Sequence, residues 1–179
     1  MITTTLLGLF WLFLPAGFAN MAPVIFKGVD LLNKPIDFGK TFRGKRIFGA
    51  HKTFRGFFFG ILLAIVILYW QTLLAQKTAW FALLDYSSIS VLGVGFLLGF
   101  GALGGDALKS FFKRQCNIKP GARFIPFDEI DWVVGTLVCL SFIVSFSWLQ
   151  IILSLVMFSF LHILTNFVSF TLGLRKTQW

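Results

Sequence analysis

The chain has 179 residues, of which 57% are hydrophobic and only 13% are charged, and its mean hydropathy is +0.84. Because a soluble domain carries about 25% charged residues, these values exclude an ordinary soluble fold and predict an integral membrane protein. The net charge of +9 then favours anionic headgroups and phosphorylated substrates, rather than nucleic acid, as partners.

The length allows a single transmembrane domain over residues 1–179, built from a few helices. The two cysteines, Cys116 and Cys139, lie in a basic loop and in an apolar segment. Their positions indicate neither a disulfide framework nor a metal site.

Apolar runs predict the membrane-crossing helices, each near the ~20 residues that cross a bilayer core. The five expected spans cover residues 3–26, 57–74, 89–108, 132–146 and 148–172. Pro15 and Pro23 interrupt the first span, so we expect it to be kinked or partly re-entrant. The third span is rich in glycine, which permits close contact between helices. The last two spans are separated only by a short uncharged gap around Ser147.

Basic residues predict the orientation of these spans. They lie mainly in loop 27–56, in loop 109–131 and in the tail at Arg175 and Lys176, whereas the opposite side has only Lys77. By the positive-inside rule, both loops and the C-terminus are cytoplasmic and the N-terminus is outside. We therefore expect an all-α, multi-pass protein of the cell membrane whose site faces the cytoplasm. Loop 27–56 is expected to be irregular or only partly helical.

Acids and bases gather where the third span ends. If its helix continues through Arg114, then Asp106, Lys109 and Lys113 fall on one face at positions i, i+3 and i+7, with Ser110 beside them. Such a face places one carboxylate within a turn or two of two ammonium groups. It could hold a divalent ion while the cations bind phosphate oxygens.

Two further carboxylates, Asp128 and Asp131, lie three residues apart at the start of the fourth span and would also share a helix face. Mg2+ is commonly held by one or two carboxylates together with substrate phosphates and water. Spacing alone supports a second interpretation equally well, in which these acids pair with nearby Lys and Arg and anchor helix ends. The unusual feature is the concentration of acidic residues, since four of the seven in the chain lie in this region: Asp106, Asp128, Glu129 and Asp131.

The first loop ends in a second group of polar residues, at 49–56. His51, Lys52, Thr53 and Arg55 lie there among small residues and could bind a phosphate. The segment lacks the spacing of a P-loop, and taken alone it favours a basic loop that binds anionic lipid. His51 is interpreted as a hydrogen-bonding residue or phosphate contact. The chain has no Gly-x-Ser-x-Gly, His-Glu-x-x-His or Cys-x-x-Cys motif, so serine hydrolase and zinc protease functions lack support.

Together these segments resemble a known family. Ser110-Phe-Phe-Lys113-Arg114, Lys119 and Asp128-x-x-Asp131 are similar to the C-terminal signature of CDP-diacylglycerol synthases. The pairing of Gly-x-His-Lys-Thr-Phe-Arg-Gly with Gly-Asp-x-x-Lys-Ser-Phe, with Lys119-Pro-Gly and Pro-Phe-Asp128, resembles more closely the CDP-archaeol synthase family. Ala50 stands where many members of that family carry Asp. The His-Gly-Gly of the diacylglycerol enzymes is missing, which argues against that branch.

The resemblance implies transfer of a cytidylyl group from CTP to a lipid phosphate such as 2,3-bis-O-geranylgeranylglycerol 1-phosphate. The products would be a CDP-lipid of the CDP-archaeol type and pyrophosphate, with Mg2+ as the cofactor. The metal ligands that it implies are Asp106, Asp128 and Asp131, which with Lys109 and Lys113 form the expected catalytic group. The implied phosphate-binding and supporting residues are Lys52, Thr53, Arg55, Lys109, Ser110, Lys113, Arg114 and Lys119.

Other functions stay open at this point. CDP-diacylglycerol synthesis from phosphatidic acid uses the same chemistry with different lipid tails. A transporter would place ionisable groups deep within spans, whereas here nearly all the charge lies at one boundary. A non-catalytic protein that binds phosphate lipids could keep the same basic loops, and the chain could form a homo-oligomer.

Overall fold

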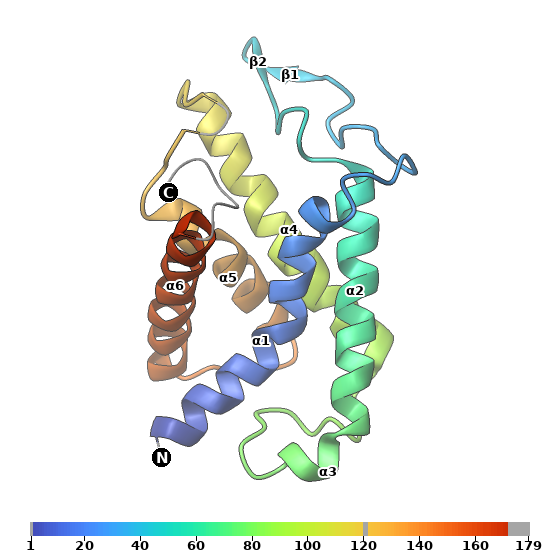
Figure 1. The fold of residues 1–179 in the computed structure, drawn as a ribbon, viewed down its shortest axis with the longest axis vertical. Coiled ribbons are helices and arrows are strands. Elements are labelled where there is room, and N and C mark those ends of the chain that lie inside the picture. The colour runs from blue at the N-terminus through green and yellow to red at the C-terminus, as the bar shows by residue number, and fades with distance from the viewer. Residues whose placement is uncertain (1, 120–121, 172–179) are drawn as a thin grey trace.

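The computed structural model describes residues 2–119 and 122–171, and its fold is mainly helical (Figure 1). The Pro120-Gly121 part of the family motif and the tail cations Arg175 and Lys176 lie outside the described residues. The helices are α1 (Ile2–Ile25), α2 (Phe54–Leu73), α3 (Ala75–Thr78), α4 (Val91–Gln115), α5 (Phe127–Leu140) and α6 (Trp148–Thr171). Strands β1 (Thr41–Phe42) and β2 (Lys45–Arg46) pair antiparallel as a hairpin.

Four of the helices in the described part of the chain, α1, α2, α4 and α6, are long and apolar enough to cross a membrane. The expected fourth span is instead the 14-residue helix α5, which begins at Phe127 and ends at Leu140, earlier than the apolar run 132–146 suggests. At 1.5 Å per residue it is about 21 Å long, shorter than the ~30 Å hydrocarbon core. The expected count of five spans is therefore not confirmed. The boundary near Ser147 is confirmed, because α6 starts at Trp148.

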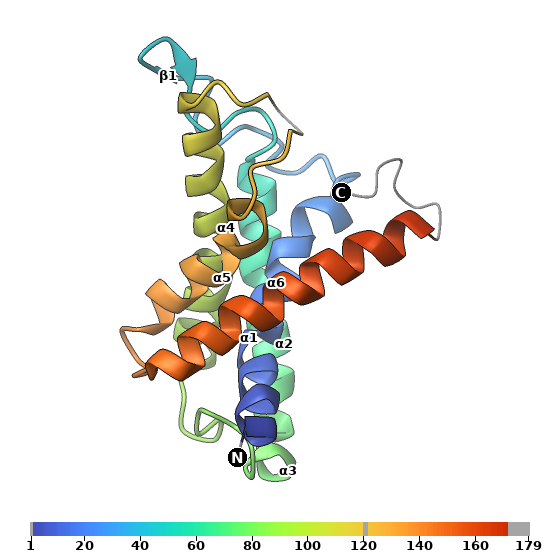
Figure 2. The same cartoon turned by 90° about the vertical axis from the view of Figure 1, so that its left-hand side faces the viewer.

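The helices run up and down between two ends of the molecule. The N-terminus lies at one end with α3, and the hairpin lies at the other end, together with the C-terminal end of α4 (Figure 1). In the orthogonal view α6 crosses obliquely over the bundle (Figure 2). The predicted placement of both long loops at one end is confirmed, whereas their orientation relative to a membrane stays a prediction.

The expected interruption of α1 takes the form of a bend. The segment is helical over its whole range Ile2–Ile25, with Pro15 and Pro23 inside it, and its axis changes direction in Figure 1. A proline removes one backbone hydrogen bond and crowds the preceding turn, which is a common cause of such kinks.

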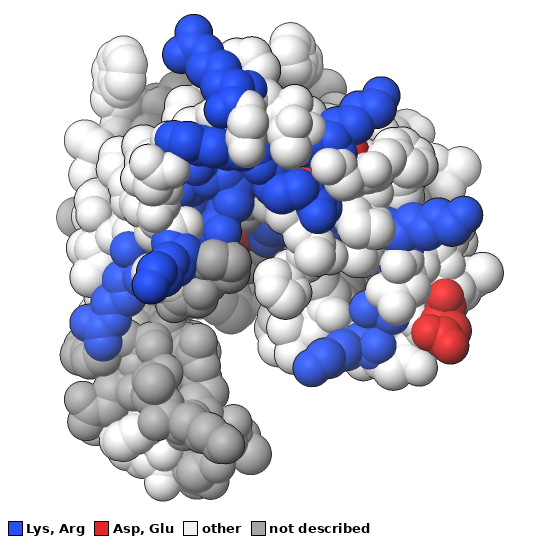
Figure 3. Space-filling model, turned by 90° about the horizontal axis from the view of Figure 1, so that it is seen from above, with Lys and Arg blue, Asp and Glu red and all other residues white. Residues whose placement is uncertain are grey.

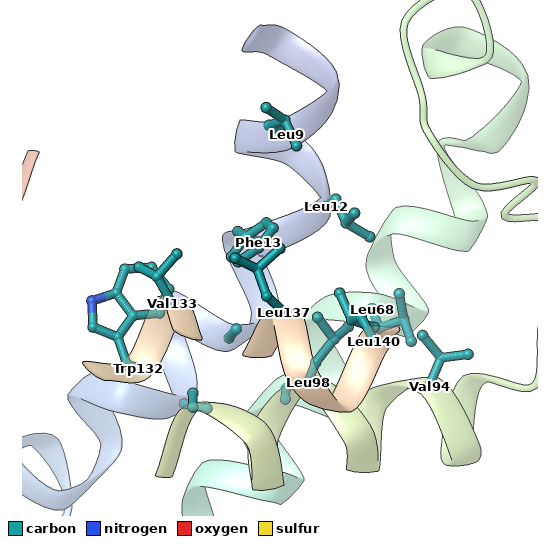
Figure 4. Close-up of a cluster of buried hydrophobic side chains, with 14 of the residues drawn as sticks. Leu9, Leu12, Phe13, Leu68, Val94, Leu98, Trp132, Val133, Leu137 and Leu140 are labelled. Carbon is teal, nitrogen blue, oxygen red and sulfur yellow. The ribbon is translucent and has the colours of Figure 1, made fainter. Parts of the chain in front are cut away.

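The core lies where α1, α2, α4 and α5 meet. The side chains of Phe13, Leu98, Val133 and Leu140 are fully buried and belong to one apolar cluster (Figure 4). Phe13 also packs against Trp132 and Phe158 of α5 and α6, at centroid distances of 6.4 and 5.0 Å. This apolar interior fixes α5 against α4, and with it the start of α5.

Glycines bring α4 and α5 into direct backbone contact. A Cβ atom added at Gly101 would lie 2.8 Å from the Gly135 carbonyl oxygen and 2.9 Å from the Thr136 Cα. One added at Gly105 would collide with the Asp131 carbonyl group, and one at Gly135 would lie 2.8 Å from the Gly105 Cα. The glycine-rich sequence predicted this kind of contact, and the close crossing lies immediately below the charged ends of both helices.

Candidate functional site

Helix α4 extends to Gln115 and presents the predicted polar face. Ser90 caps its start, where the hydroxyl oxygen accepts a hydrogen bond from the Gly93 N–H at 3.2 Å. The extension past the apolar run confirms that Asp106, Lys109 and Lys113 share one side of a helix. The Lys109 ammonium lies 3.1 Å from Asp106 Oδ1.

The first turn of α5 adds the two other predicted carboxylates. The Lys109 Nζ atom lies 2.6 Å from Asp131 Oδ2 and 3.2 Å from Asp128 Oδ1, so one ammonium group contacts three aspartates. The Asp131 Oδ1 atom accepts a hydrogen bond from the Trp132 N–H at 2.7 Å, and Asp128 Oδ2 accepts one from the Phe124 N–H at 2.7 Å. These backbone bonds fix the orientation of both carboxylates.

Two more lysines complete the cluster from opposite directions. The Lys52 ammonium, from the first loop, donates to Asp106 Oδ2. The Lys113 ammonium lies 3.0 and 3.1 Å from the two Asp128 oxygens and also donates to the Ala122 carbonyl. We call these six residues the Asp–Lys cluster: Lys52, Asp106, Lys109, Lys113, Asp128 and Asp131. Its three negative and three positive formal charges balance.

The Asp–Lys cluster is largely covered but reachable. The exposed fraction of its side chains runs from 5% at Asp131 to 23% at Asp128. Seen from the loop end of the molecule, Lys and Arg side chains spread over the surface, whereas acidic surface shows mainly as one patch at the right-hand edge (Figure 3). An anion that approaches this end therefore meets cations first.

Asp37 organises the loop that carries Lys52, and the sequence analysis did not single it out. Its carboxylate accepts hydrogen bonds from the Arg46 guanidinium at 2.7 Å and from the backbone N–H groups of Gly39, Phe48 and Gly49 at 2.9–3.0 Å. Burial opposes ionisation of this group, but these bonds, with that from Arg46 first, hold the pKa of the Asp37 carboxyl well below its usual value. The available sequence signal was Asp-x-Gly, since an Asp side chain commonly caps a turn two residues on.

The other predicted residues of the first loop make local contacts. Thr53 caps α2, accepting from the Gly56 N–H at 3.2 Å. Arg55 is buried and donates to the Val29 carbonyl, which ties loop 27–56 to the start of α2. His51 is exposed in a turn. The loop is not helical, and its hairpin was not expected; Lys45 in that hairpin donates to the Gln115 carbonyl at 2.6 Å.

The remaining predicted residues belong to α4 and the loop after it. The Ser110 hydroxyl donates to the Asp106 carbonyl at 2.9 Å, within its own helix. Arg114 is half-buried in the last turn of α4, and Lys119 is exposed in the following loop. The structure thus brings Lys52, Asp106, Lys109, Lys113, Asp128 and Asp131 together and places the other expected residues around them.

An apolar groove of about 830 Å³ runs beside the Asp–Lys cluster, between α4 and α5. Among the described residues that line it, Lys109 and Asp131 are the charged ones. Loop residues such as Phe48 and Phe124 line it near the cluster, while Val138 and Cys139 line it toward the other end of α5. The groove therefore places a long apolar surface beside two charged residues of the Asp–Lys cluster, as an amphiphilic ligand requires.

The sequence of this chain is similar to those of known proteins over almost its whole length. The family model described as CarS-like, CDP-archaeol synthase, matches residues 2–179. The chain belongs to the CDP-archaeol synthase family. A CDP-archaeol synthase of Pyrococcus furiosus is 36% identical over 173 residues, covering 95% of this chain and 96% of the relative. One of Methanocaldococcus jannaschii is 33% identical over 171 residues, covering 94% of each.

A solved structure supports the same fold. An intramembrane enzyme for archaeal membrane lipids biosynthesis superposes with a TM-score of 0.71, over 88% of this chain and 91% of that chain, at 24% identity. The resemblance inferred from the two sequence motifs is confirmed by the family match. Within the CDP-archaeol synthase family, this chain carries both motifs on elements that meet in the Asp–Lys cluster.

The donor chemistry of the cluster suits a hard divalent cation. Three carboxylates converge on one cationic position, which the Lys109 ammonium takes. Within the described residues no three His, Cys, Asp or Glu side chains are placed to share a metal ion directly. Mg2+ needs only one or two carboxylates when phosphate and water supply its other ligands, so the oxygen donors present here fit it.

Proposed function

We propose that this protein transfers a cytidylyl group from CTP to the phosphate of an isoprenoid glycerolipid, giving a CDP-archaeol-type lipid and pyrophosphate. Membership of the CDP-archaeol synthase family supports the reaction class. The observation that carries the proposal is the position of the Asp–Lys cluster against the apolar groove, whose lining includes Lys109 and Asp131. A lipid phosphate in that groove would hold its headgroup at Lys109.

The reaction needs cations that neutralise phosphate charge more than it needs a strong base. An oxygen of the lipid phosphate attacks the α-phosphorus of CTP, a new P–O bond forms, and the bond to the β-phosphate breaks to release pyrophosphate. The attacking phosphate is already anionic near neutral pH. The barrier therefore lies in bringing two anions together and stabilising the leaving group, which positioned cations do through alignment and neutralisation.

We assign the alignment of the two phosphates and the neutralisation of their charge to the lysines of the Asp–Lys cluster. Lys52 reaches the cluster from the first loop and Lys109 and Lys113 from α4, so the three ammonium groups surround the aspartates from different sides. When CTP and lipid phosphate enter, these ammonium groups exchange carboxylate partners for phosphate oxygens. The exposed cations at the loop end attract both anions and orient the triphosphate.

Mg2+ is the proposed cofactor, with Asp106, Asp128 and Asp131 as the residues that would hold it, one or two of them directly and the rest through phosphate oxygens and water. When bound there, the ion would neutralise phosphate charge and stabilise the pyrophosphate that leaves. The backbone bonds to Asp128 and Asp131 keep these oxygens directed at the site. We also assign the loop end to the cytoplasm, where CTP is available, in agreement with its excess of Lys and Arg.

The experiment is a liposome assay with labelled CTP, Mg2+ and an isoprenoid glycerol phosphate, run on the wild type, Asp128→Asn and Asp85→Asn. We expect CDP-lipid from the wild type, loss with a chelator, and at least a ~100-fold lower kcat in Asp128→Asn, as for loss of one charge-stabilising group. Asp85→Asn is the control, since it removes the same charge from a turn between α3 and α4. The Asp85 carboxylate accepts hydrogen bonds there from the Ser87 N–H and hydroxyl groups. Absence of CDP-lipid from folded wild-type protein would refute the proposal.

A further inference from the structure

The α4 wall of the apolar groove has a notch at Gly104. Positions 100, 104, 108 and 112 follow one another at intervals of four along one side of the helix, and all four line the groove. Three of them carry large apolar side chains, namely Phe100, Leu108 and Phe112, which are 44%, 56% and 50% exposed. Gly104 leaves a gap in that row.

Packing against α5 does not require glycine at this position. The neighbours Gly101 and Gly105 face the backbone of α5, where a Cβ atom would collide. A Cβ atom added at Gly104 would meet nothing closer than Phe100 Cε1, at 3.9 Å. Glycine in a helix lowers stability by about 1 kcal/mol relative to alanine, so an open glycine here has a cost without a packing reason.

The notch lies close to the phosphate-binding group of the site. The Lys109 ammonium, 3.1 Å from Asp106 Oδ1 and 2.6 Å from Asp131 Oδ2, lies back along α4 toward Gly104. Gly104 precedes Asp106 by two residues, about 3 Å along the helix axis. In an ether-linked isoprenoid glycerol phosphate, seven bonds separate phosphorus from the first methyl-bearing carbon, or about 8 Å at the 1.2 Å or so per bond of an extended chain. The first branch is therefore the one that a phosphate held at Lys109 brings nearest to Gly104.

We propose that Gly104 is a specificity-determining residue, whose missing side chain accepts the first methyl branch of an isoprenoid chain. This inference rests on the proposed function, since it needs a lipid phosphate seated with its headgroup at the Asp–Lys cluster. A straight chain has no substituent at this depth and does not need the notch. A side chain at position 104 would fill the space of the branch and leave the phosphate site intact.

The test compares Gly104→Val with the wild type on two diether glycerol phosphates of the same stereochemistry, one with isoprenoid and one with straight alkyl chains. We expect kcat/KM for the branched lipid to fall about 10-fold or more, within the range that one added or missing methylene gives in an apolar pocket. The value for the straight-chain lipid should change less than ~3-fold on the same scale, and the KM for CTP should stay constant. An unchanged branched-to-straight ratio would overturn the inference.

Gly17→Val is the matched control. Gly17 is also a helical glycine whose added Cβ would meet its nearest atom at 3.9 Å, the Trp132 Cη2, but it lines a different cavity between α1, α5 and α6. Its branched-to-straight ratio should equal that of the wild type. An equal shift in both variants would show a general effect of valine on the bundle and would also overturn the inference.

A binding measurement separates this inference from the reaction itself. The rise in melting temperature that each lipid phosphate gives, without CTP, is measured for the wild type and for Gly104→Val. A rise with the branched lipid that is lost in Gly104→Val supports the notch even if no CDP-lipid forms, in which case only the proposed reaction fails. Should Gly104→Val not fold, Gly104→Ala is measured in its place. The rise in melting temperature that the branched lipid gives must then be smaller in Gly104→Ala than in the wild type, and an equal rise would refute the notch.

Discussion

Gly105→Ala is the substitution whose effect the structure defines most sharply. The new methyl group would collide with the Asp131 carbonyl and lie 3.1 Å from the Gly135 Cα, so α4 and α5 must move apart. Overpacking of this kind costs about 1–3 kcal/mol, whereas alanine gains about 1 kcal/mol in helix propensity. Gly104→Ala gains the same propensity and meets only a contact at 3.9 Å. The two variants should therefore differ by about 1–3 kcal/mol in unfolding free energy.

The assay is thermal unfolding of both variants in the same detergent. With a shift of about 2–4 °C per kcal/mol for a chain of this size, Gly105→Ala should melt roughly 2–12 °C below Gly104→Ala. The rate of cytidylyl transfer should fall in Gly105→Ala by more than its loss of folded protein explains. The reason is that separation of the helices lengthens the 2.6 Å contact between Lys109 and Asp131. Equal melting temperatures for the two variants would refute the inference that glycine sets the spacing of α4 and α5.

Three further predictions concern the Asp–Lys cluster and its loop. Lys109→Met removes the ammonium that three carboxylates share. The affinity for Mn2+ without CTP, measured by EPR, should therefore rise at least ~10-fold, which is about 1.4 kcal/mol. An unchanged affinity would contradict the inference that the three carboxylates converge on one cation position. Lys52→Met should lower kcat/KM for CTP about 100-fold, while Lys34→Met, an exposed lysine of the same loop, should match the wild type. Asp37→Asn should lower the melting temperature at pH 7. Since the folded pKa of Asp37 is depressed, its stabilisation is complete above the unfolded pKa of about 3.9 and is lost as pH falls below it, so the wild type and Asp37→Asn should converge in acid.

Local spacing was enough to predict one half of the cluster. Asp106, Lys109 and Lys113 share a face in any α-helix that reaches residue 114, and the apolar run made that helix the expected structure. The other half depends on tertiary structure. The contact of Lys52 with Asp106 joins residues 54 apart, and it forms only because a loop whose path the sequence does not reveal returns over the end of α4.

Hydropathy located the apolar segments better than it located the helix ends. It reports which residues avoid water, whereas a helix begins where the backbone can be capped and packed. Helix α5 therefore takes in Asp128 and Asp131, which precede its apolar run, and it ends at Leu140, before the apolar residues Phe142 and Ile143. The groove was not predictable either. It depends on which side of α4 packs against α5, and the close contacts of Gly101 and Gly105 with the α5 backbone set that side.

The central claim is that the aspartates of this cluster hold the metal ion of cytidylyl transfer. The most direct test is Asp131→Cys in a chain whose Cys116 and Cys139 are changed to Ala, assayed for CDP-lipid with Mg2+ and then with Cd2+. A thiolate binds Cd2+ far better than Mg2+. We predict that activity is lost with Mg2+ and partly restored by Cd2+, while the Asp131 parent shows no gain with Cd2+. Equal activity of the Cys variant in both metals, or loss that Cd2+ does not relieve, would contradict the assigned role.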